Sequence, residues 1–147
     1  MQKKWLFFFI ISYLVAFSIN VFPSMKFPDV SVNGYHILAT CFFLVGLVTY
    51  ILKGMKSSIE ISRLKGFLFI GFFSGFLIYL FHIFEDIGAG GFAADIIGSI
   101  QYPFYIIFTI PLFGGNYLFQ LNYAIYSIIA SFIYFILYLW VNRRAKQ

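Results

Sequence analysis

Residues 96–142, IIGSIQYPFYIIFTIPLFGGNYLFQLNYAIYSIIASFIYFILYLWVN, decide the fold because they contain no charged residue. A helix needs about 20 apolar residues to cross the hydrocarbon core of a bilayer, so this stretch is too long for one span. Pro103 and Pro111 divide it. Residues 117–141 then form a complete span, and the segment 96–113 must be placed by other means.

The composition places the chain in a membrane. Of its 147 residues, 62% are hydrophobic and only 10% are charged, whereas soluble domains are about half apolar and a quarter charged. A soluble fold of this length could not cover so much apolar surface, and a bilayer can act as the solvent instead. The basic residues flank apolar runs and build no nucleic-acid-binding patch. We therefore expect an all-α integral membrane protein that contacts the lipid bilayer and binds no nucleic acid.

Four apolar runs are long enough to cross a bilayer. They cover about residues 5–22, 35–52, 67–84 and 117–141. We expect them to form a single membrane domain, residues 1–147. Before the third run, Ser57 is followed three residues later by Glu60, which is the pattern of a capping box, so a helix is expected to begin there and run into the membrane. Pro23 is expected to end the first helix.

The distribution of charge places the segment 96–113. With four spans and a cytoplasmic N-terminus, the basic residues other than Lys26 all lie inside, as the positive-inside rule requires. A fifth span would move Arg143, Arg144 and Lys146 outside. We therefore expect a four-transmembrane-helix bundle in a cell (plasma) membrane with both termini cytoplasmic. The segment 96–113 is then a re-entrant or interfacial outer segment between helices 3 and 4, and five spans are the alternative.

Small residues predict how the helices meet. Gly71 and Gly75 lie one turn apart in the third span, and Ser127 and Ser131 do so in the last span. Helices in lipid associate through close packing of such residues. We expect both faces to be helix-packing sites within one chain, with a homo-oligomer as the alternative. The single cysteine, Cys41, is likewise expected to be a small core residue.

The stretch LFHIFED, residues 80–86, places a histidine and two acids between two apolar runs. His82, Glu85 and Asp86 share one helix face, and His36 opens the second span on the same side of the membrane. The simplest interpretation is a helix end at the membrane interface. The two imidazoles and two carboxylates would also suit zinc, iron or manganese, although their spacing matches no established ligand motif. Haem between the two histidines is a further alternative, and otherwise no cofactor is expected.

The sequence shows no catalytic motif. It has no Gly-x-Ser-x-Gly elbow and no phosphate-binding glycine loop. No histidine, acid or base lies at mid-membrane, where pumps and coupled transporters usually need one. We therefore expect a non-catalytic accessory, regulatory or immunity-type subunit that binds another membrane component, such as a membrane-protein partner. The alternatives are a metal- or haem-binding protein that uses the histidines and acids named above, and a small oligomeric channel or solute carrier.

Overall fold

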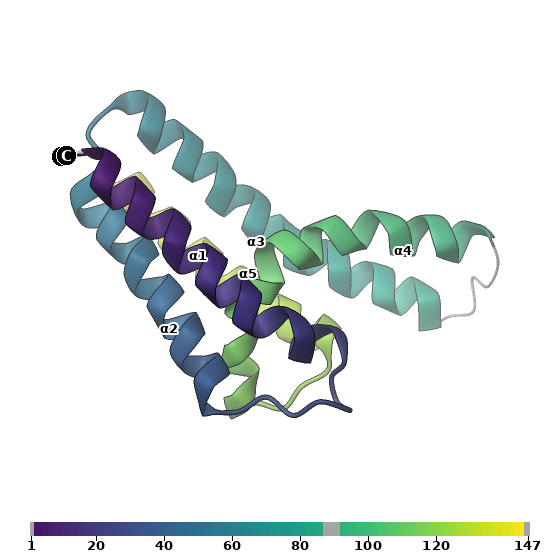
Figure 1. Ribbon diagram of the computed structural model, residues 1–147. Helices are drawn as coiled ribbons and strands as arrows, with labels where there is room; N and C mark the ends of the chain where they lie inside the picture. The colour runs from purple at the N-terminus through teal and green to yellow at the C-terminus, as the bar shows by residue number, and fades with distance from the viewer. Residues whose placement is uncertain (1, 87–91, 146–147) are drawn as a thin grey trace.

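The protein folds as a bundle of helices (Figure 1). The computed structural model describes the backbone of residues 2–86 and 92–145, and their side chains except those of Gln2, Glu85, Asp86, residues 92–95 and Ile97. These ranges contain no strand. In chain order the elements are α1 (Gln2–Met25), α2 (Gly34–Thr49), the π-helical turn η1 (Tyr50–Gly54), α3 (Ser58–Asp86), α4 (Phe92–Phe104), the π-helical turn η2 (Tyr105–Thr109), the 3-10 helix η3 (Ile110–Leu118) and α5 (Tyr123–Arg144).

In the described part of the chain, four helices are long and apolar enough to cross a membrane. They are α1, α2 continued by η1, α3 and α5, with spans at Lys3–Met25, Gly34–Gly54, Ser58–Phe84 and Tyr123–Arg144. Large apolar side chains such as Phe7, Leu38 and Ile136 are exposed along these helices. Such an apolar surface is stable when lipid covers it. The predicted four-helix membrane bundle is therefore confirmed.

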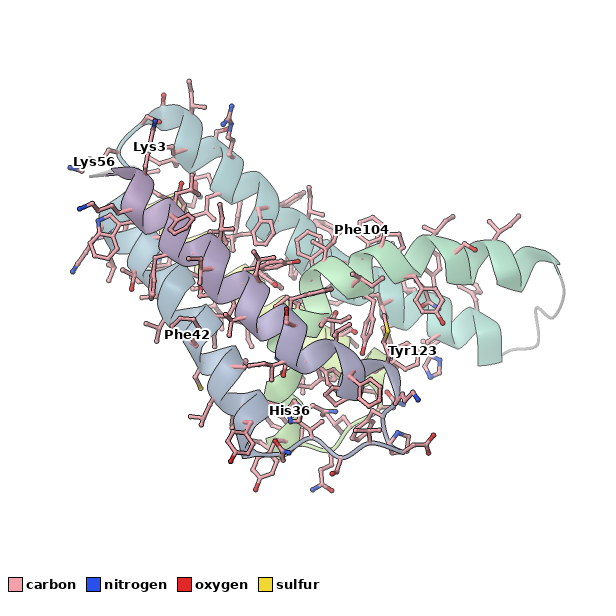
Figure 2. All side chains as sticks on the ribbon, viewed as in Figure 1. Lys3, His36, Phe42, Lys56, Phe104 and Tyr123 are labelled. Atoms are coloured by element: carbon pink, nitrogen blue, oxygen red, sulfur yellow. The ribbon has the colours of Figure 1, made fainter. Side chains whose placement is uncertain are left out.

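The basic residues gather at one end of the bundle, which we call the basic end. Figure 2 shows Lys3 and Lys56 there, and it shows His36 at the opposite end of α2. The Lys53 ammonium lies 5.0 Å from the centroid of the Trp5 ring, and indoles beside basic residues are typical of a membrane interface. The described residues that define this end are Lys3, Lys4, Lys53, Lys56, Arg63, Lys65, Arg143 and Arg144.

The helix starts follow the capping chemistry of the sequence. At the start of α3, the Glu60 N–H donates to Ser57 Oγ at 3.2 Å, and the Ser57 N–H donates to Glu60 Oε2 at 3.2 Å. The predicted capping box is therefore present. α5 begins later than the apolar run because Asn122 caps it, with its Oδ1 accepting the Ile125 N–H at 2.8 Å.

Two expectations about single residues are wrong. Pro23 lies inside α1, which continues to Met25. Pro23 has no N–H to donate, so it removes one backbone hydrogen bond, but it lies two residues before the end of α1, where almost no helix is left to interrupt. Cys41 is exposed on α2 instead of buried, because its neighbours Thr40 and Phe43 occupy the packed face.

α3 and α5 form the most extensive helix pair in the described part of the chain. A Cβ atom on Gly75 would overlap the Ser127 carbonyl oxygen and lie 2.6 Å from Ser131 Cβ. A Cβ atom on Gly71 would lie 2.8 Å from the ring of Tyr134. The two glycines therefore let the backbone of α3 approach α5 closely, as small residues do between helices in lipid.

α4, η2 and η3 together form a re-entrant segment between the third and fourth spans. α4 packs along α3, and the two form a hairpin that extends away from α2 (Figure 1). With 13 residues, α4 is about 20 Å long and too short to span a bilayer. η2 then contacts α3 and α5, and η3 packs against α1 and α2. His82 near the end of α3 contacts Tyr123 at the start of α5, so the segment enters and leaves at the same end. The fold therefore adopts the arrangement with four spans instead of five.

Candidate functional site

The tip of the re-entrant segment reaches the middle of the bundle. Tyr13, halfway along α1, donates its hydroxyl to the Ile107 carbonyl at 3.0 Å. Tyr134, halfway along α5, donates to the Phe108 carbonyl at 2.9 Å. Backbone that departs from a regular helix inside a membrane needs such partners, because no water is there to replace them. The two tyrosines therefore hold the tip at mid-depth.

A buried amide in α1 holds the returning part of the segment. Asn20 Nδ2 donates to the Pro111 carbonyl at 3.2 Å and to Thr40 Oγ1 at 3.0 Å. Thr40 Oγ1 in turn donates to the same carbonyl at 3.1 Å. Asn20 is fully buried, and it is not among the residues predicted from the sequence. The sequence feature that could have identified Asn20 is an amide inside an apolar span, because an amide in lipid needs a hydrogen-bond partner on another helix.

A cavity opens where the re-entrant segment enters the bundle. It has a volume of about 260 Å³ and is bounded by α1, α3, α4, η2 and α5. We call it the tyrosine cavity, and it is lined by Ser24, Met25, Ile78, Gln101, Tyr102, Tyr105 and Tyr123. None of these lining residues carries a charge.

Hydrogen bonds and ring contacts fix the walls of the tyrosine cavity. The Tyr105 hydroxyl donates to the Ser24 carbonyl at 3.0 Å and so joins η2 to α1. The Tyr105 ring meets the Tyr123 ring edge-on, with 5.8 Å between centroids. The Tyr123 hydroxyl lies 3.3 Å from His82 Nδ1 and so joins α5 to α3. Tyr102 also lines the cavity, and its side chain is exposed.

The lining suits an uncharged amphipathic group. It combines the apolar side chains of Met25 and Ile78 with tyrosine side chains and the buried Gln101 amide. Ligand sites commonly pair apolar walls with a few polar groups that fix orientation. This lining can hold an aromatic or aliphatic group that carries one or two hydrogen-bonding atoms. An ionic ligand would find no charged partner among the lining residues.

The residues predicted as metal ligands have different surroundings. His36 lies in the first turn of α2, and its Nδ1 accepts the Asn33 backbone N–H at 3.0 Å, so one ring nitrogen serves to cap the helix. His82 instead lies beside the start of α5. The side chains of Glu85 and Asp86 are outside the described part. Among the described side chains, no three His, Cys, Asp or Glu residues come together in a way that could hold a metal ion.

No protein-family model matches the chain, and no curated protein or solved structure matches it. The fold and the site nevertheless define a class. The chain is a multi-pass helical membrane protein with a re-entrant segment and an uncharged cavity beside it.

Proposed function

We propose that this protein is a non-catalytic accessory or regulatory subunit that binds another membrane component through the tyrosine cavity. The cavity itself carries the proposal, because its lining is uncharged and combines apolar walls with hydrogen-bonding groups. The bound group is an uncharged amphipathic part of a membrane partner. An immunity-type protein, which captures its partner in the membrane, is one form of this activity.

The use of polar side chains inside the bundle favours binding over transport. Ser12, Ser74 and Ser131 each donate to a carbonyl of their own helix, at 2.7 to 2.8 Å. Asn20 and Thr109 bond to other elements. Transport of a charged solute usually requires ionisable residues along the pathway. In the described part of the chain, these polar groups support helices and the re-entrant segment instead.

We also propose that the basic end faces the cytoplasm of a plasma membrane. Lysines and arginines in short loops favour the cytoplasmic side, and the bundle has Lys26 as the single described base at its other end. The tyrosine cavity then lies in the outer half of the membrane. A partner would reach it from the outer leaflet or from the outer surface.

Site-specific photo-cross-linking tests this function. Benzoyl-phenylalanine replaces Tyr102, which lines the tyrosine cavity and is 58% exposed. The control position is Ile136, which is 64% exposed on α5 and lies outside the cavity lining. In native membranes we expect one discrete adduct from position 102, identified by mass spectrometry, and only general lipid adducts from position 136.

A variant that fills the cavity completes the test. Met25→Trp adds bulk to the lining, whereas Phe22→Trp makes a similar change about one turn earlier on α1, outside the lining. We expect Met25→Trp to remove most of the adduct at Tyr102 and Phe22→Trp to leave it unchanged. Identical adducts at positions 102 and 136, or an adduct that survives Met25→Trp, would show that partners do not bind in the tyrosine cavity.

A further inference from the structure

The basic end contains a second cavity, which the proposed function does not use. It has a volume of about 210 Å³ and lies where η1, the start of α3 and the end of α5 meet. We call it the arginine cavity, and it is lined by Ile51, Met55, Ile61, Val141, Arg144 and Ala145. It therefore places one cation beside four larger apolar side chains.

The guanidinium of Arg144 is held in position at this cavity. Its Nη1 donates to the Ile51 carbonyl at 3.1 Å. Its central carbon lies 5.9 Å from the centroid of the Trp140 ring. A guanidinium has five N–H donors in a planar fork that matches phosphate oxygens. Because one of these donors bonds to the Ile51 carbonyl, the guanidinium still has N–H groups that can bind an anion.

The electrostatic field at the basic end favours an anion. Among the described residues at this end, Glu60 is the single acid beside the eight bases. Its Oε2 already accepts the backbone N–H groups of Lys56 and Ser57, at 3.1 and 3.2 Å. These bonds fix the carboxylate at the start of α3, against the loop that precedes this helix. The cations around the cavity attract negative groups at the membrane surface.

The apolar walls select a lipid over a free ion. A phosphate alone would gain nothing from Ile51, Ile61 and Val141, whereas a phospholipid brings apolar atoms next to its phosphate. The indoles of Trp5 and Trp140 lie beside basic residues at this end, which places the cavity at headgroup depth. We propose that the arginine cavity binds the phosphate headgroup of an anionic phospholipid, with Arg144 as its direct partner. This site is independent of the tyrosine cavity.

Lipid titration with two neighbouring arginine variants tests the proposal. The full chain in detergent micelles is titrated with phosphatidylglycerol, and native mass spectrometry gives the Kd. Arg144→Gln removes the lining cation, and Arg143→Gln removes the same charge one residue away, outside the lining. We expect Arg144→Gln to raise the Kd at least about fivefold more than Arg143→Gln, because a charge-assisted, fork-shaped contact adds to the general attraction. Equal losses would overturn the proposal, since they would show only a diffuse surface attraction.

Two further measurements separate phospholipid binding in the cavity from a folding defect and from binding of a free anion. Ala145→Trp fills the cavity at an exposed position and keeps every cation, so it tests the site even if Arg144→Gln folds poorly. We expect this variant to weaken phosphatidylglycerol binding about as much as Arg144→Gln, and unchanged binding would contradict the site. Inorganic phosphate in excess is expected not to displace the lipid. Displacement by phosphate would show an anion site that does not select a phospholipid.

Discussion

At the scale of single residues, the contact between α3 and α5 depends on Gly75. A Cβ atom there would overlap the Ser127 carbonyl oxygen, so Gly75→Ala must push the two helices apart. We expect it to lower the free energy of unfolding by about 1–3 kcal/mol, the usual cost of overpacking. Gly66→Ala is the matched control in the same helix, because its Cβ would meet nothing within 4 Å among the described residues. It should stabilise the protein by up to about 1 kcal/mol through helix propensity.

Reversible unfolding in mixed detergent and SDS micelles measures both changes. The opposite signs of the two effects form the test. Equal shifts for Gly75→Ala and Gly66→Ala would mean that α3 and α5 do not approach each other at Gly75.

The two histidines allow a direct test of the metal-site alternative. Nδ1 of His36 already accepts a backbone N–H, and His82 lies beside Tyr123. We therefore expect the purified protein to contain no stoichiometric metal or haem, and His82→Ala to leave the metal content unchanged. Elemental analysis measures the metal content, and the visible absorption spectrum shows whether haem is bound. One metal per chain that disappears in both His36→Ala and His82→Ala would establish the metal site and contradict this expectation.

At the scale of elements, the re-entrant segment depends on hydroxyl groups from α1 and α5. Tyr134→Phe leaves the buried Phe108 carbonyl without the donor that it has now. An unsatisfied buried acceptor costs about 1–3 kcal/mol, so we expect a loss of that size in the unfolding assay. Tyr138→Phe removes a hydroxyl one turn later at a half-buried position and should cost less than about 0.5 kcal/mol. A similar loss in both variants would argue against a specific role for the Tyr134 hydroxyl.

The sequence predicts the spanning helices better than it predicts the segment between them. An uncharged apolar run of sufficient length is enough to indicate a span. By composition the segment 96–113 resembles a span too, and the count of basic residues on each side favours four spans over five. The hydrogen bonds from Tyr13 and Tyr134 that hold the segment join residues 94 and 26 positions apart. No local pattern in the sequence reveals such pairs.

The candidate site could not be predicted in the same way. In an apolar chain the charged residues stand out, so the sequence directed attention to His82, Glu85 and Asp86. The tyrosine cavity has no charged lining residue and is built from five elements, so its residues share no spacing. Asn20 is the one residue that could have indicated a contact of the re-entrant segment, because an amide within a span predicts a buried hydrogen-bond partner. It could not indicate that the partner would be the Pro111 carbonyl.

At the scale of the whole molecule, the two ends of the bundle carry different proposed sites. The arginine cavity lies at the basic end, and the tyrosine cavity lies where the re-entrant segment enters. We therefore expect the two sites to act independently. Arg144→Gln should leave photo-cross-linking at Tyr102 unchanged, and Met25→Trp should leave phosphatidylglycerol binding unchanged. A change in either cross-measurement would show that the ends are coupled through the bundle.

The most direct test of the four-span, re-entrant fold is cysteine accessibility in intact cells that express the protein. Cys41→Ser removes the native thiol, and single cysteines then replace Ser31, Lys56 and Gln120, which are all exposed. A membrane-impermeant maleimide is expected to label Ser31→Cys and Gln120→Cys directly, and Lys56→Cys only after permeabilisation. If Gln120→Cys is labelled only together with Lys56→Cys, the segment 96–113 crosses the membrane and the re-entrant fold is contradicted.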